Sequence, residues 1–266
     1  LGGSLNNWKD SYDFFLEKGF QVIGLDLPGY GKSFKPKSKM GIPYYGQVLK
    51  DFIQFLKLKE LPVLVGNSMG GHIGIYYAAK YKSRLKGLVL VNSSGLNEMN
   101  FLQELLVNFT FEQSRIGAIL KHLTDLSTLN LFYDISCPNA RVFVEEQKEM
   151  SKRQDYPLYC YALEESTQAM MNYPVKDILS EIKVPSLILW GENDRLIPSF
   201  YSEQFHKGLQ GSTLHYIKKC GHIPEMEKPE VFNSLLLEWI LGNNLQNSRS
   251  RGSLIGKLFK YFKEER

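Results

Sequence analysis

The stretch that most constrains this chain is residues 63–74, in which three apolar residues run directly into Gly-Asn-Ser-Met-Gly. A helix-like apolar pattern follows, so the stretch predicts a strand, a sharp turn with Ser68 at its apex, and a helix. Glycines two residues on either side of the serine let strand and helix pass closely, and the turn lifts the serine oxygen above the sheet. The same pentapeptide also occurs in plain turns, but the flanking strand and helix favour a reactive serine.

The 266 residues, of which 43% are hydrophobic, suffice for one α/β domain with an insertion or for two small domains. No apolar run reaches the ~18–20 residues that a membrane-spanning helix needs, and the start of the sequence has no secretory signal pattern. Three widely spaced cysteines, Cys137, Cys160 and Cys220, indicate a reducing, cytoplasmic compartment. They predict neither a disulfide framework nor a zinc site, and we expect no metal and no cofactor.

The net charge of +4 has a local origin, because residues 249–266 hold six basic and two acidic side chains while the remainder is neutral. A nucleic-acid-binding protein usually carries its charge across a folded face. The sequence therefore argues against nucleic acid as a partner.

Strand-like and helix-like patterns alternate along most of the chain, which predicts a parallel sheet covered by helices on both faces. Strands are expected at residues 21–26, 63–65, 88–91, 184–190 and 213–217, and helices at 46–58 and 229–241. A further helix should begin near residue 8, capped by Asn6 or Asn7. Residues 27–33 end in Gly-Lys-Ser, but a phosphate-binding loop needs glycine where Asp26 stands, which argues against a nucleotide site.

Residues 97–180 interrupt this alternation with repeated helical spacing and no convincing strand, so a helical insertion is expected there. Its later part is rich in aromatic residues and methionine: Tyr156, Tyr159, Tyr161, Met170, Met171 and Tyr173. The simpler interpretation is that these residues form the core of the insertion. The alternative is a pliable apolar pocket, which such side chains also build.

Three polar residues, Ser68, Asp194 and His222, each follow a different predicted strand. Reactive groups gather at the carboxyl ends of parallel strands, so these side chains are expected to meet. A serine hydroxyl is a poor nucleophile at neutral pH. It needs a base within hydrogen-bond reach and an acid that fixes the tautomer of that base.

Of the histidines, only His222 lies in a glycine-containing loop after a late strand. The others are expected to pack or to lie within regular elements: His72, His122, His206 and His215. For the acid, Glu192 and Glu98 are the reserve candidates behind Asp194, and a surface carboxylate in a turn is the alternative for all three.

Four segments together resemble the signatures of the α/β-hydrolase family: Leu-Asp-Leu-Pro-Gly-Tyr-Gly-Lys-Ser (25–33), Gly-Asn-Ser-Met-Gly-Gly (66–71), Trp-Gly-Glu-Asn-Asp (190–194) and Cys-Gly-His-Ile-Pro-Glu-Met-Glu-Lys-Pro (220–229). The resemblance covers residues 1 to about 242. It implies a mostly parallel, doubly wound sheet with a helical cap. It also implies Ser68 as nucleophile, Asp194 as acid and His222 as base, in the family's order along the chain. The oxyanion hole carries over to the N–H groups of Met69 and Ser4.

The expected organisation follows from this resemblance. The core comprises residues 1–96 and 181–242, the cap residues 97–180, and a linker with a basic tail residues 243–266. The chain departs from the family before Ser4, where Gly-Gly replaces the usual His-Gly. In the family this segment directly follows the third strand, so the resemblance implies that one to three amino-terminal strands are missing. A sheet without them is expected to fold poorly, because many backbone groups lose their partners.

Serine at the turn apex argues against the family's dehalogenases and epoxide hydrolases, which place aspartate there. The resemblance implies an esterase or lipase-like serine hydrolase that cleaves a carboxylic ester of an apolar or amphipathic small molecule through an acyl-enzyme. Two alternatives stay open. One is a C–C bond hydrolase of the meta-cleavage product type, which Gly-Asn-Ser-Met-Gly-Gly also resembles. The other is a non-catalytic binding protein with this fold.

The basic tail begins with a linker at residues 243–252. Leu254, Ile255, Leu258, Phe259 and Phe262 then share one helical face, opposite Lys257, Lys260 and Lys263. The favoured interpretation is a helix docked on the body or a disordered end. The alternative is peripheral attachment of residues 249–266 to an anionic membrane surface.

Overall fold

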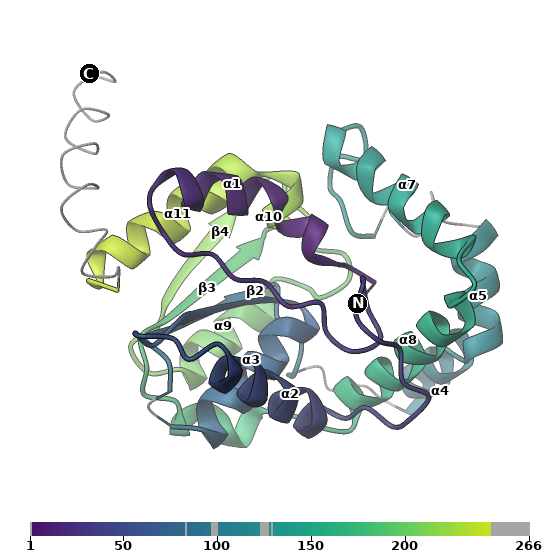
Figure 1. Cartoon of the computed structure of the whole chain (residues 1–266), viewed down its shortest axis with the longest axis horizontal. Coiled ribbons are helices and arrows are strands. Elements are labelled where there is room, and N and C mark those ends of the chain that lie inside the picture. Colours follow the sequence, from purple (N-terminus) through teal and green to yellow (C-terminus); the bar gives the residue numbers. More distant parts are fainter. Residues whose placement is uncertain (1, 83, 97–100, 123–127, 129, 246–266) are drawn as a thin grey trace.

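The computed structural model describes residues 2–82, 84–96, 101–122, 128 and 130–245. Its centre is a parallel four-stranded sheet in the order β1-β2-β3-β4 (Figure 1). The strands are β1 (Val63–Asn67), β2 (Gly87–Val91), β3 (Ser186–Gly191) and β4 (Thr213–Ile217). These four predicted strands and the α/β fold class are confirmed.

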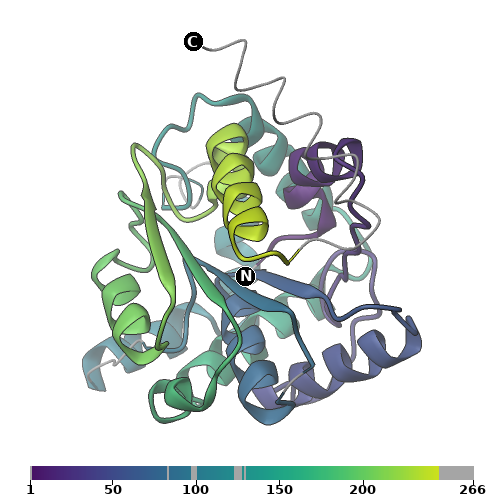
Figure 2. The ribbon, with the colours of Figure 1, turned by 90° about the vertical axis from the view of Figure 1, so that its left-hand side faces the viewer.

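Helices cover both faces of this sheet (Figure 2). On one face lie α1 (Lys9–Glu17) and α11 (Pro229–Gly242), and on the other α2 (Ile42–Phe55), α3 (Met69–Lys80) and α9 (Phe200–Gly208). Successive side chains of a strand point to opposite faces. Accordingly Val89 packs into the cluster under α1 and α11, and Leu88 into the cluster under α2 and α3. We call these the α11-side and α3-side clusters.

The amino-terminal helix is capped by a different residue from the one predicted. A short 3-10 helix, η1 (Leu5–Trp8), precedes α1, and Ser4 is its cap. The Ser4 hydroxyl accepts the N–H of Asn6, and the Asn7 side chain accepts the N–H of Ser4. The prediction of Asn6 or Asn7 as the cap is therefore wrong, because the serine hydroxyl and Asn7 form a reciprocal capping box.

The strand predicted at residues 21–26 is also absent from the sheet. Its side chains do alternate as in a strand, since Val22 packs on the α11-side cluster and Leu25 and Leu27 on the α3-side cluster. A strand requires a hydrogen-bonded neighbour, however. Among the described residues no strand pairs with this segment, so the apolar pattern produces an unpaired segment.

Four helices follow β2 before the chain returns to β3: α4 (Phe101–Thr110), α5 (Gln113–His122), α7 (Pro138–Ser151) and α8 (Tyr156–Met171). They lie together beside the sheet in Figure 1. Within residues 101–122 and 130–180 there is no strand, as predicted. A second 3-10 helix, η2 (Lys176–Glu181), leads into β3. Tyr159 and Met170 of α8 pack into the α3-side cluster, which supports the simpler interpretation of the aromatic and Met-rich residues as core.

Two of the sequence expectations concern regions that the structure does not describe. The amphipathic tail falls within residues 246–266, and the reserve acid Glu98 falls within residues 97–100; both lie outside the described residues. In the part of the chain that is described, no helix has the length and apolar character needed to cross a membrane. Cys137, Cys160 and Cys220 are all free thiols.

Candidate active site

Ser68 occupies a strained turn between β1 and α3. Its φ is 53° and its ψ is −116°, a conformation that side-chain-bearing residues rarely adopt outside functional sites. A Cβ on Gly66 would collide with the backbone of Gly70, and a Cβ on Gly71 would collide with Ser93, whereas Gly70 has open space. The close passage of strand and helix therefore depends on Gly66 and Gly71, and the predicted requirement at Gly70 is wrong.

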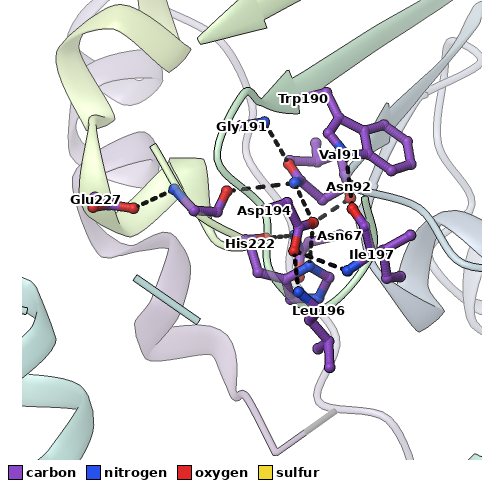
Figure 3. Close-up of polar contacts among 11 residues, drawn as sticks. Asn67, Val91, Asn92, Trp190, Gly191, Asp194, Leu196, Ile197, His222 and Glu227 are labelled. Carbon is purple, nitrogen blue, oxygen red and sulfur yellow. Dashed lines mark hydrogen bonds and ion pairs between the residues drawn. The ribbon is translucent and has the colours of Figure 1, made fainter. Parts of the chain in front are cut away.

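Asp194 lies in the loop after β3 and is 7% exposed. Four donors surround its carboxylate (Figure 3). Oδ1 accepts the N–H groups of Leu196 at 2.8 Å and Ile197 at 2.9 Å. Oδ2 accepts Nδ2 of Asn92 at 2.6 Å and lies 2.7 Å from Nδ1 of His222. Both oxygens are thus fixed in direction, and one of them faces the imidazole.

His222 follows β4 and is 2% exposed. Because its Nδ1 lies 2.7 Å from a carboxylate oxygen, the proton of the neutral ring belongs on Nδ1. Nε2 is then an acceptor, and it has no hydrogen-bond partner among the described residues. The backbone N–H of His222 donates to the carbonyl of Leu131 at 2.7 Å, which ties the histidine loop to the helical insertion.

Ser68 and His222 are brought to the same end of the sheet by the residue that precedes the serine. The Asn67 side chain donates to the carbonyl of His222 at 2.9 Å and to the carbonyl of Val91 at 3.3 Å. No hydrogen bond joins the Ser68 hydroxyl to Nε2 of His222 in this structure. His222, Met69 and Ser4 all line a cavity of about 400 Å³.

The two predicted oxyanion donors differ in availability. Met69 is the first residue of α3, where backbone N–H groups have no partner within the helix and point toward incoming negative charge. The Ser4 N–H already donates to Oδ1 of Asn7, although that bond is long at 3.4 Å. The Met69 N–H is therefore placed to meet an anion, whereas Ser4 would have to release Asn7 first.

Sequence reasoning missed Asn92, which is fully buried directly after β2 with a φ of 43°. Besides donating to Asp194, its side chain accepts the N–H of Gly191 at 3.1 Å. One amide therefore joins the end of β2 to the loop after β3. Its position at a strand's carboxyl end was the available signal, because the other polar residues were recognised by that criterion.

Glu227 belongs to the segment 220–229, and the sequence pattern by itself predicts no role for it. It lies in the short helix α10 (Pro224–Glu227) and is 5% exposed. Its carboxylate accepts three backbone N–H groups, from Gly221 at 2.6 Å, Asp134 at 2.6 Å and Tyr133 at 3.1 Å. This side chain clamps the loop before His222 against the helical insertion.

The remaining candidates lie elsewhere. His72 is buried, and its Nε2 bonds the carbonyl of Tyr173 at 2.7 Å, so it packs as predicted. His206 bonds Ser212, His215 is exposed on β4, His122 is exposed at the end of α5, and Glu192 is exposed beside Asp194. Among the described residues, the histidine that faces a carboxylate is His222. No group of three His, Cys, Asp or Glu side chains within that part of the chain is arranged to hold a metal ion.

Comparisons with known proteins are consistent across sequence and structure. A family model described as alpha/beta hydrolase fold matches residues 1–229. The chain is 29% identical over 242 residues to the 2-hydroxy-6-oxononadienedioate/2-hydroxy-6-oxononatrienedioate hydrolase of Escherichia coli strain K12, covering 88% of this chain and 81% of that protein.

Two solved structures are similar over most of the chain. One is a bacterial membrane phospholipase A, with 25% identity and a TM-score of 0.74 over 91% of this chain and 76% of that one. The other is an esterase from Exiguobacterium antarcticum, with 23% identity and a TM-score of 0.75 over 88% of this chain and 87% of that one. At its lower identity, the second match supports the fold alone.

Proposed function

The chain belongs to the α/β hydrolase fold family, and on that basis we propose that it is a serine hydrolase that cleaves a carboxylic ester of an apolar or amphipathic small molecule. The observation that carries the proposal is the buried pair of His222 and Asp194. Its Nδ1–Oδ2 distance is 2.7 Å, and Nε2 has no hydrogen-bond partner among the described residues. His222 and Met69, the neighbour of Ser68, line the same cavity.

In the first half of the reaction, Nε2 of His222 takes the proton of the Ser68 hydroxyl while Oγ attacks the ester carbonyl. The serine hydroxyl has to reorient toward Nε2, and such bonds commonly tighten only when substrate binds. The negative charge on the carbonyl oxygen meets the N–H of Met69 and, once Asn7 is released, that of Ser4. Each such donor lowers the barrier by about 3 kcal/mol.

In the second half, the proton on His222 passes to the departing alcohol, which leaves an acyl group on Ser68. The same nitrogen then takes a proton from water while the water oxygen attacks the acyl carbon. That proton passes to Oγ of Ser68 as the bond between Oγ and the acyl carbon breaks, which releases the carboxylic acid and restores the serine hydroxyl. Asp194 stays ionised throughout. It stabilises the imidazolium and holds the ring in place, and its remaining bonds to Asn92, Leu196 and Ile197 keep its own orientation.

The helical insertion is proposed as a cap that shapes the substrate site. Leu131 and Phe143 of this segment line the cavity together with His222, and the rest of its wall is largely apolar. A wall of this kind favours an apolar or amphipathic acyl or alcohol group over a strongly charged one.

A fluorophosphonate probe tests the activated serine directly, because it reacts covalently only with such a group. Labelling should map to Ser68 and vanish in Ser68→Ala. The matched control is Ser212→Ala, since Ser212 also bonds a histidine, His206 at 2.8 Å, but lacks the strained turn. Undiminished labelling in Ser68→Ala would overturn the proposal. Absence of labelling in a folded wild-type protein would favour the non-catalytic binding protein.

A C–C bond hydrolase is the second candidate, favoured by the Escherichia coli relative, whose name specifies a hydroxy-oxo-dienedioate substrate. The two candidates separate when p-nitrophenyl esters of increasing chain length are compared with 2-hydroxy-6-oxononadienedioate. We expect a higher kcat/KM for an ester. A higher kcat/KM for the dienedioate, lost in Ser68→Ala, would assign the C–C reaction.

A further inference from the structure

Tyr30 is a buried tyrosine in the loop at residues 27–33, and the catalytic steps proposed above do not use it. It is 4% exposed and lines the same cavity as His222 and Met69. Its ring meets that of Tyr159 in α8 edge to face, at a centroid distance of 6.2 Å. Tyr30 therefore lies where the core, the helical insertion and the cavity meet.

The hydroxyl of Tyr30 is used within the protein. It donates to Oγ of Ser166 in α8 at 2.7 Å and lies 3.3 Å from the carbonyl of Ala162. Ser166 is completely buried. Burial raises the pKa of the Tyr30 phenol well above its ordinary value, so the group remains a neutral donor. Because the hydroxyl is already bonded to α8, the side chain can offer a substrate only its apolar ring.

A second tyrosine shares the same acceptor. Tyr45 of α2 is completely buried, and its hydroxyl lies 3.0 Å from Oγ of Ser166 and 3.3 Å from the carbonyl of Pro28. Burial raises the pKa of its phenol to about 12. Tyr45 is not among the described residues that line the cavity. The two tyrosines are thus alike in burial and in hydrogen bonding, and they differ in their access to the cavity.

The loop that carries Tyr30 is held against α8 at two further places. Gly29 has a φ of 96°, and a Cβ there would lie 2.6 Å from Cβ of Ala162. Lys35 is 5% exposed and forms an ion pair of 3.0 Å with Asp155, the residue that precedes α8. Close packing and a largely buried cation therefore restrict movement of the loop, and with it movement of the Tyr30 ring.

We propose that Tyr30 is a specificity-determining residue whose ring limits the length of the apolar chain that a substrate can place in the cavity, and that Ser166 is the positioning residue that holds this ring. A ring bonded at its outer end cannot turn aside without leaving buried polar groups unpaired, which costs free energy. A short chain leaves the ring in place, whereas a longer chain has to displace it. The role of Tyr30 in turnover rests on the proposed ester hydrolysis, but the same limit applies to binding without reaction.

The kinetic test measures kcat/KM for p-nitrophenyl acetate, butyrate, hexanoate and octanoate, and for the methyl to octyl esters of butyric acid. Tyr30→Ala removes the ring, and each methylene that enters the vacated space should raise kcat/KM by about fourfold relative to wild type. The ratio of long to short esters should therefore rise about tenfold or more in the acyl series, the alcohol series or both. An unchanged ratio in both series for folded Tyr30→Ala overturns the proposal.

The matched pair of variants is Tyr30→Phe and Tyr45→Phe, since each removes one hydroxyl that contacts Ser166. Tyr30→Phe should raise the ratio of long to short esters less than Tyr30→Ala does, because the ring remains but is no longer held. Tyr45→Phe should lower the thermal midpoint about as much and keep the wild-type ratio. An equal rise of the ratio in both variants would assign the effect to a loosened core and overturn the role of Tyr30.

The positioning role of Ser166 is tested by Ser166→Ala, which leaves both tyrosine rings in place. The ratio of long to short esters should rise as in Tyr30→Phe, and the change in KM for the long esters should exceed the change in kcat. A ratio that stays at the wild-type value in folded Ser166→Ala overturns this role.

Binding without turnover separates the chain-length limit from the proposed hydrolysis. Esters cannot be cleaved by Ser68→Ala, so calorimetric titration of that protein gives Kd directly. Adding Tyr30→Ala should tighten octanoate binding relative to butyrate binding by about tenfold or more. If this shift occurs while the wild type hydrolyses none of the esters, the limit stands and the proposed hydrolysis fails. If the wild type hydrolyses the esters and no ratio shifts, or if no ester binds, the limit is overturned. Should Tyr30→Ala fail to fold, Tyr30→Phe and Tyr45→Phe decide by the same ratios.

Discussion

Two histidines are almost completely buried in this molecule, and their surroundings differ in one decisive respect. His72 has contacts on both ring nitrogens, with Nε2 2.7 Å from the carbonyl of Tyr173 and Nδ1 3.4 Å from the hydroxyl of Ser94. His222 has a carboxylate on Nδ1, and no described residue forms a hydrogen bond with its Nε2. His72 also lies one helical turn after Ser68, and its N–H donates to the carbonyl of that serine. Burial is thus similar for the two rings.

The comparison shows that the groups around a buried histidine determine whether it can accept a proton. Without a carboxylate beside it, burial lowers the pKa of His72 to about 4, so this ring stays neutral near pH 7 and its nitrogens are used in packing. Asp194 instead offers His222 a fixed negative charge that can stabilise a transferred proton. A vacant nitrogen then makes His222 available for proton transfer, and no vacant nitrogen remains on His72.

The largest effect should come from removing the proposed base or nucleophile. Replacing His222→Ala or Ser68→Ala should lower kcat by about 10⁵-fold, because the two groups act as one unit. His72→Gln should leave kcat within a few-fold of wild type. The measurement is steady-state hydrolysis of a p-nitrophenyl ester, with circular dichroism to verify folding. A comparable loss in folded His72→Gln would erase the distinction between the rings.

Asp194→Asn should lower kcat by about 10⁴-fold while the protein remains folded, because an amide cannot stabilise the imidazolium and favours the wrong tautomer. Glu192→Gln is the matched control, since Glu192 is in the same loop but exposed. It should retain wild-type kcat. An equal loss in Glu192→Gln would identify the wrong carboxylate.

The next largest effect should be a loss of folding stability at low pH that is caused by His72. His72 has a pKa of about 4 when folded and about 6.5 when unfolded, so the unfolded state takes up the proton first as pH falls. Stability is therefore lost from about pH 6.5 down to pH 4, by about 3 kcal/mol for this group. Urea unfolding should show that the free energy of unfolding of the wild type falls between pH 6.5 and pH 4. The fall should be smaller by about 3 kcal/mol in His72→Gln. Identical losses in both proteins would contradict the assignment.

Glu225, whose pKa is raised by burial, has the opposite effect on the pH dependence of stability, and it therefore provides the control for that experiment. Its folded pKa of about 8 lies above its usual value, so its contribution is complete below about pH 4.5 and is lost as pH rises toward 8. Glu225→Gln should therefore reduce the loss of stability as pH rises toward 8. The loss of stability as pH falls toward 4, which is attributed to His72, should be unchanged. A change confined to the acid limb would show that another group dominates there.

The smallest effect is expected at the positioning residue Asn92. Asn92→Ala removes the 2.6 Å donor to Asp194 and should lower kcat about tenfold with little change in KM, since the carboxylate loses one of its four donors. Asn92→Ser, which keeps a donor hydroxyl, should recover part of the loss. A shifted pH–kcat profile in Asn92→Ala distinguishes misplacement of the acid from general destabilisation. An unchanged profile with unchanged kcat would remove Asn92 from the site.

Local chemistry made much of this molecule predictable. The turn at Ser68 was predicted because glycine-flanked serine after an apolar strand has few other solutions, and its φ of 53° confirms the strain. Asp194 and His222 were selected because both follow strands, and they meet at 2.7 Å. Asn92 satisfied the same criterion but was missed, because an amide is chemically ordinary until a carboxylate is placed beside it.

By itself, the sequence determined where apolar strands and helices form and which polar side chains follow them, since these depend on residues close together in the chain. The tertiary structure alone decided that no described strand pairs with residues 21–26, that Asn92 donates to Asp194, and that Glu227 accepts three backbone N–H groups around the histidine loop. Each of these outcomes depends on hydrogen-bond partners and charges that come from distant segments, and local patterns contain no record of them.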